Sequence, residues 1–314
     1  MNKKNTLSPD TALKDYWRDN RRFADFINHA FVKEKFHIKS EKLQEADTEE
    51  STAILIDEEL EELIRRRDTA KYYEAALILL ITMEHQMKIH YAMPVRLMLN
   101  DSLYYLKQCR ELENIHKDKR DFESADEFLS GMKKEDRLNG IFNIVIYYGD
   151  KEWDGPHKLS DMLEIPAALL PYFNDYKIFV LSARDIDPNL FEHKDNQDFF
   201  QMIQEFYSSK GRIQKKKFME KYAGMNIWWE TLAALGAVTG YKGLLKKAVE
   251  NKGGNITMCN ALLDWEMEIT EEVTNKNIKK LIRVLRKAGV EDSFIAESLK
   301  EEYLLSEEQV KEYL

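Results

Sequence analysis

The sequence predicts an α/β core followed by a helical region. Two observations lead to this prediction. Between residues 51 and 185, strand-like apolar runs are separated by a helix-like segment, an order typical of sheets covered by helices. From about Asp187 to the end, the apolar residues recur at helical spacing. We therefore predict two regions, a core over residues 1–186 and a mainly helical region over residues 187–314.

The composition narrows the class of protein. The chain has 314 residues, of which 44% are hydrophobic and 33% charged, as in folded globular proteins. Its net charge of −9 argues mildly against a general nucleic-acid coat protein but allows a local basic groove. We expect no membrane span and no secretory signal. The two cysteines, Cys109 and Cys259, form no disulfide or metal-ligand pattern, so we expect a cytoplasmic protein.

The elements are predicted in chain order. An amphipathic helix is expected over residues 12–32, because bulky apolar residues recur there every three or four positions. A second helix is expected over residues 94–112, since proline suits a first helical turn. The composition of residues 57–75 also favours a helix. Four strands are expected, over residues 52–56, 76–86, 141–148 and 176–181.

The strand at 76–86 ends in an unusual pattern, ALILLITMEHQMK. The apolar run suits a strand covered on both faces. Alternation would then project Glu84, Gln86 and Lys88 from one face and His85 from the other. A charge beside a buried sheet is costly unless it is paired or binds a metal. Asp68 becomes a second metal ligand if the chain folds back as a hairpin, although a strand-end glutamate is more often simply solvated.

Several motifs resemble one protein family. The stretch RD at 67–68, the run MEHQMKIHYAMPVR at 83–96 and LKQC at 106–109 are similar to the Rpn family of recombination-promoting nucleases, many of them described as transposases, within the PD-(D/E)XK superfamily. Further similar stretches are EADTEEST at 45–52, EFLSGMKKEDRL at 127–138, IYYG at 146–149 and WDGP at 153–156. The resemblance implies a restriction-endonuclease-like mixed sheet flanked by helices.

The resemblance also implies roles for particular residues. Asp68 and Glu84 match the two metal-binding acids, and Gln86 stands where the superfamily has lysine. Glutamine can orient a water molecule but supplies no charge, so Lys88 is expected to replace part of that charge. Asp25 is the expected accessory acid on the first helix. Two positions depart from the family pattern, Met87 and Asn100, and neither removes a proposed ligand.

The function implied is a metal-dependent DNA endonuclease that acts in recombination or on mobile or foreign DNA. Its expected cofactor is Mg²⁺ or another divalent cation such as Mn²⁺ or Ca²⁺. A catalytically idle descendant that binds DNA or a protein partner is the alternative, and homo-oligomerisation stays open. If DNA is bound, Lys279, Lys280 and Arg283 are candidate contacts to its backbone, although such a helix face is more often merely solvated.

Overall fold

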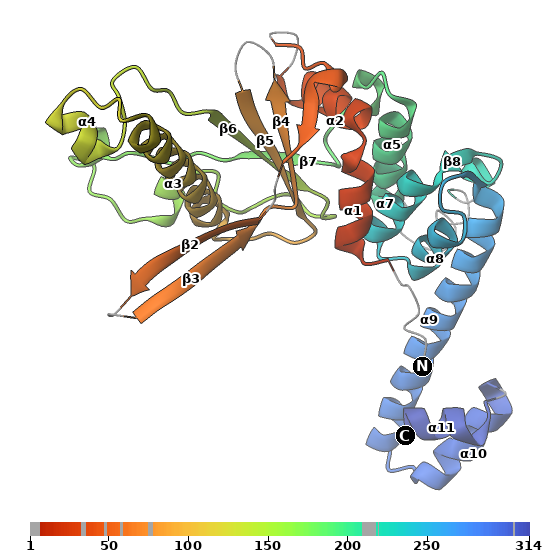
Figure 1. The fold of residues 1–314 in the computed structure, drawn as a ribbon. Helices are drawn as coiled ribbons and strands as arrows, with labels where there is room; N and C mark the ends of the chain where they lie inside the picture. The colour runs from red at the N-terminus through yellow and green to blue at the C-terminus, as the bar shows by residue number, and fades with distance from the viewer. Residues whose placement is uncertain are drawn as a thin grey trace. The chain divides into compact units, whose positions relative to one another are not determined.

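The computed structural model describes residues 7–32, 36–46, 49–56, 59–74, 78–208, 218, 220–303 and 305–314 (Figure 1). The chain forms two compact units. The first comprises Met1–Phe218 and Ile227–Ile256, and the second comprises Met219–Asn226 and Thr257–Leu314. This division differs from the predicted boundary after residue 186, because residues 187–218 and 227–256 belong to the first unit.

A five-stranded mixed sheet forms the centre of the first unit. Its order is β1 (Leu43–Glu45), β4 (Thr69–Glu74), β5 (Ile78–Gln86), β6 (Gly140–Tyr147) and β7 (Phe179–Ser182). Strand β5 runs antiparallel to β4 and parallel to β6, and β6 runs parallel to β7. The predicted α/β class is therefore confirmed. The predicted interior strand is also confirmed over residues 78–86, whereas residues 76 and 77 lie outside the described residues.

The helix that the composition of residues 57–75 favours is not formed by the described residues of this segment. Strand β3 (Glu59–Arg66) pairs with β2 (Glu49–Ile56) as a separate antiparallel ribbon, and β4 follows after a short turn. The composition of this segment suits a helix, but the ladder partners that β2 and β5 provide outweigh this local preference. Residues 57, 58 and 75 lie outside the described part of the chain.

The N-terminal helix is interrupted, where one continuous helix was predicted. It forms α1 (Pro9–Arg18), α2 (Asn20–Phe26) and a π-helical turn over Ile27–Val32. Asp19 causes the break, because its extended backbone ends α1 while its side chain accepts hydrogen bonds from the first amides of α2. Next to these helices lie α5 (Lys194–Ser208), α7 (Trp229–Thr239) and α8 (Lys242–Glu250) (Figure 1).

Helices cover both faces of the sheet (Figure 1). On one face lies α3 (Met93–Lys119), which buries Leu97 against Val145 of β6 and Tyr104 against Leu80 of β5. On the other face, Trp17 of α1 stacks on His85 of β5 with 6.4 Å between ring centroids. The remaining short elements are α4 (Ala125–Ser130) and the 3₁₀ turns Ser40–Lys42, Leu159–Met162, Leu170–Tyr172 and Pro188–Leu190.

Lys71 ties the N-terminal helices to the sheet. Its side chain is fully buried, and its ammonium donates to the Arg18 carbonyl, the Asn20 amide oxygen and the Glu45 carboxylate, each at 2.7 Å. Burial lowers the pKa of Lys71, and the Glu45 carboxylate opposes that shift. The three acceptors satisfy all three donors of the ammonium group.

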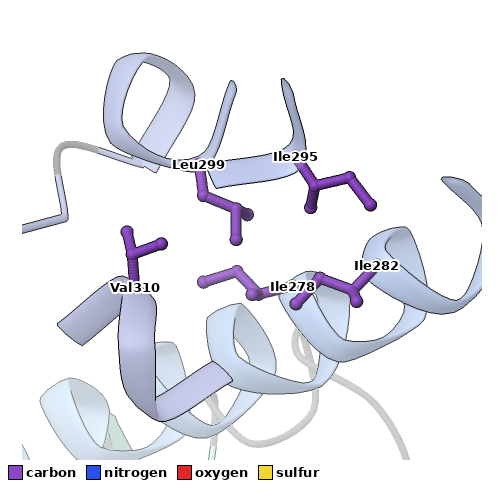
Figure 2. Packing of buried hydrophobic residues seen from close by; sticks show 5 residues of the cluster. All are labelled: Ile278, Ile282, Ile295, Leu299 and Val310. Atoms are coloured by element: carbon purple, nitrogen blue, oxygen red, sulfur yellow. The ribbon is translucent and has the colours of Figure 1, made fainter. Parts of the chain in front are cut away.

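The second unit is mainly helical. It contains α9 (Met258–Lys287), α10 (Asp292–Tyr303) and α11 (Glu307–Tyr313). Figure 2 shows its core, in which one face of α9 meets the two shorter helices through Ile278, Ile282, Ile295, Leu299 and Val310. The short strands β8 (Asn226–Trp228) and β9 (Asn255–Thr257) pair where the chain passes between the units. Each helix that the structure describes is too short or too polar to cross a lipid bilayer.

Candidate active site

Asp68 and Glu84 meet at the end of the central strand. The register of β4 and β5 pairs Thr69 with Met83, which brings Asp68, one residue before β4, level with Glu84. The Asp68 carboxylate accepts a hydrogen bond from the His85 backbone amide, with 2.8 Å between Oδ2 and N. The Asp68 backbone amide lies close enough to the Glu84 carboxylate to favour its charged form. The hairpin required by the sequence prediction is therefore present.

The two acids share a poorly hydrated environment. Glu84 is fully buried, and this burial, together with the nearby negative charge of Asp68, raises the pKa of Glu84 to about 7. Burial also raises the pKa of Asp68, and the hydrogen bond from His85 opposes that rise. A cation next to the pair would remove much of this electrostatic cost.

Arg96 supplies one such cation. It lies near the start of α3, and its Nη2 is 2.9 Å from Glu84 Oε2. The Arg96 side chain is one-third exposed, whereas the Glu84 side chain is fully buried. The ion pair favours the charged form of Glu84, but the stronger effect of burial still leaves the pKa of this carboxyl above its usual value.

The other oxygen of Glu84 is a candidate metal ligand. Glu84 Oε1 is buried and has no hydrogen-bond partner among the described residues, so a lone pair faces the interior unsatisfied. Across the described part of the chain, no group of three or more acidic, histidine or cysteine side chains converges as a metal site. Mg²⁺ commonly binds one or two carboxylates and completes its shell with waters and substrate phosphate, so two acids are compatible with this ion.

The structure places the other three residues predicted for this strand, Gln86, Lys88 and His85, in different surroundings. Gln86 ends the strand, is half-buried, and lies two residues after Glu84, so the alternation gives both side chains the same face. Lys88 is exposed and lies beyond the strand end, so the alternation that was expected to align it with Glu84 does not reach it. His85 lies on the opposite face against Trp17, and its burial lowers its pKa to about 3.

Asp25 has a different role from the one that the resemblance implies. Both of its carboxylate oxygens are occupied: Oδ1 accepts from the Glu192 backbone amide at 2.9 Å, and Oδ2 accepts from the Asn196 side chain at 2.7 Å. His29 also lies 3.0 Å from Oδ1. Asp25 thus joins α2 to the start of α5, instead of completing the Asp68–Glu84 pair.

Three further residues that influence the site escaped sequence reasoning. Arg96 pairs with Glu84, and Asp10 on α1 raises the pKa of Asp68 through its negative charge. Arg67, next to Asp68, is buried and binds Asn143 at 2.8 Å and Asp101 at 3.3 Å. The only available signal was position: Arg67 and Arg96 flank the two acids within the family-like motifs.

The basic residues proposed as DNA contacts lie in the second unit. Lys279, Lys280 and Arg283 are exposed on α9, and two of them, Lys279 and Arg283, line a groove. Comparisons with family models, with curated proteins and with solved structures found no match to this chain. The function is therefore inferred from the residues of the site and from the motifs in the sequence.

Proposed function

We propose that the protein is a divalent-metal-dependent DNA endonuclease with a PD-(D/E)XK-like core. One observation carries the proposal. Glu84 is completely buried at the end of the central strand, next to a second acid, and one of its oxygens has no hydrogen-bond partner among the described residues. Burying a carboxylate in this way is costly, and a divalent cation is the ligand that offsets the cost best.

The proposed roles follow from the positions of the side chains. Glu84 and Asp68 hold the cation, which when bound polarises the scissile phosphate and lowers the pKa of a water molecule. Gln86, on the same strand face, accepts a hydrogen bond from the attacking water and orients it. Lys88, exposed beyond the strand, attracts the incoming phosphate backbone.

The order of these residues along the chain supports the same proposal. An acid in the turn before β4 is followed by E-x-Q at the end of β5, which is the arrangement that the resemblance to recombination-promoting nucleases implies. Under this proposal the substrate is DNA, including mobile or foreign DNA, and the cofactor is Mg²⁺, or Mn²⁺ or Ca²⁺ in its place.

Plasmid cleavage tests the proposal. Purified protein is incubated with supercoiled plasmid in Mg²⁺ and, separately, in chelator. We expect nicking only with the metal, and we expect Glu84→Gln to lower its rate on the order of a thousandfold, because about 4 kcal/mol of barrier depends on the bound cation. The matched control is Glu135→Gln, which makes the same change at an exposed acid and should cleave at the parent's rate.

A second candidate function is favoured by the Arg96–Glu84 ion pair. Its guanidinium already neutralises the carboxylate that would bind the metal, as expected of a nuclease fold that has lost its chemistry and only binds DNA or a protein. The same assay separates the two candidates. DNA binding without cleavage in Mg²⁺, Mn²⁺ or Ca²⁺ would support the idle binder.

A further inference from the structure

The second unit contains a basic groove that shares no residue with the candidate active site. The groove has a volume of about 480 Å³, which lies within the range of small-ligand sites. Four of its six lining residues are basic and none is acidic: Lys279, Ile282, Arg283, Arg286, Lys287 and Tyr313.

The packing of α9 explains why the cations gather there. Ile278 and Ile282 turn toward α10 and α11 (Figure 2), so Lys279 and Arg283, each one residue further along, emerge beside that buried face. Tyr313 of α11 forms part of the wall, and its hydroxyl donates to Asn275 of α9. The apolar core thus holds together α9, which carries the basic residues, and α11, which forms the wall beside them.

The charges in the groove are unequally satisfied. Arg286 binds Asp292 through two hydrogen bonds of 2.8 Å and also donates to the Leu314 carbonyl at 3.0 Å. Lys279, Arg283 and Lys287 are exposed, and none forms an ion pair with a described side chain. Arg286 is therefore already paired within the protein, and the other three cations are available to a ligand.

We propose that this groove binds the phosphate backbone of DNA. The choice of DNA as the polymer rests on the proposed function. The three available cations follow one another at intervals of four residues, which places them about 6 Å apart along the helix. They form a row about 12 Å long, and a row of point charges suits a chain of phosphates better than a single anion. Each phosphate contact releases counterions and makes binding depend on salt.

Binding of a labelled DNA duplex to the full-length chain tests the proposal, with chelator present so that no cleavage occurs. The test variant carries Lys279→Gln and Arg283→Gln. We expect its affinity to fall on the order of fiftyfold at 0.1 M salt and the slope of log K against log salt to fall by about two, as for the loss of two phosphate contacts. Both side chains are exposed, so folding should be unaffected.

Two controls locate the effect. Lys242→Gln with Lys246→Gln makes the same charge change at two exposed lysines of α8, also four residues apart, and should leave the salt slope unchanged. Lys276→Gln with Lys280→Gln alters α9 outside the groove lining and should weaken binding less than the groove variant. An equal loss in either control would overturn the assignment to the groove.

The ligand class is tested by competition. Inorganic phosphate at millimolar concentration should displace the duplex only weakly; if it displaces DNA as efficiently as unlabelled duplex does, the groove is a small-anion site and the proposal fails. Cleavage is scored separately. If the groove variant loses DNA binding and the parent protein does not cleave DNA, the groove assignment stands and the nuclease proposal fails. If the parent cleaves DNA and the groove variant binds as the parent does, the nuclease proposal stands and the groove assignment fails.

Discussion

The carboxylate of Asp68 accepts a hydrogen bond from the backbone amide of His85, the residue after Glu84, with 2.8 Å between Oδ2 and N. A backbone hydrogen bond thus holds Asp68 beside Glu84, although the two acids repel each other. Because peptide groups barely move once the strands are paired, the Asp68 carboxylate is placed before any ligand arrives. A site prearranged in this way loses little entropy when it binds an ion.

The pH dependence of stability should report the charge of Glu84. Its pKa of about 7 exceeds the usual value of 4.5, so the folded state keeps a proton that the unfolded state releases between these values. Without metal, the free energy of unfolding should therefore fall as the pH rises from 4.5 to 7, by about 3 kcal/mol. Urea denaturation should show this fall in the parent and in Glu135→Gln, and lose it in Glu84→Gln. A fall that persists in Glu84→Gln would assign the titration to another group.

Replacing Arg96 by glutamine should strengthen metal binding. The guanidinium competes with a cation for Glu84, so its loss leaves more negative potential at the two acids. At pH 8, Mg²⁺ should raise the melting temperature of Arg96→Gln more than that of the parent. Arg21→Gln, at an exposed arginine that is paired with Asp19, serves as the control and should respond as the parent does. If Mg²⁺ raises the melting temperature of Arg96→Gln and of the parent equally, Arg96 does not affect metal binding.

The buried Arg67 should be needed for stability. Arg67→Met leaves Asp101 without its cation, although Asn143 and Tyr176 still donate to it. Loss of one partner of a buried pair costs about 3 kcal/mol, which chemical denaturation can measure. Adding Asp101→Asn should recover part of this loss, since it removes the uncompensated charge. If the loss in free energy of unfolding for the double variant equals the sum of the losses for the two single variants, the two residues are not energetically coupled.

Asp25→Ala should affect folding and spare the chemistry. It removes the acceptor of two hydrogen bonds to the segment that begins α5, and we expect a loss of about 2 kcal/mol in the free energy of unfolding. Its rate of plasmid cleavage per folded molecule should equal the parent's. A thousandfold drop in a well-folded Asp25→Ala protein would return this residue to the active site.

Elements that depend on the order of neighbouring residues, such as an apolar run or a proline at a helix start, could be predicted from the sequence. The apolar run before Glu84 indicated an interior strand, and Pro94 marked the start of α3. The strands around Asp68 could not be predicted in this way, because their composition favours a helix and only pairing with β2 and β5 decides otherwise. Glu84 and Gln86 stand out through alternation, whereas spacing alone made Asp68 a candidate only if the chain formed a hairpin, and the family resemblance strengthened that choice.

Contacts between distant segments were beyond prediction. The role of Asp25 is determined by Asn196, which lies 171 residues later in the chain. The pairing of Arg96 with Glu84 depends on where α3 begins relative to the end of β5. A single sequence contains no periodic signal for either contact, since both arise only when packed elements bring the side chains together.

The burial of Lys71 has a practical consequence. Acylating reagents modify lysines at the surface of a folded protein, but this amine is enclosed and hydrogen-bonded on three sides. A reagent can reach it only after the contacts of β4 with the N-terminal helices or with β1 have opened. Its rate of acylation therefore measures how often this edge of the sheet opens, even while the rest of the first unit stays folded.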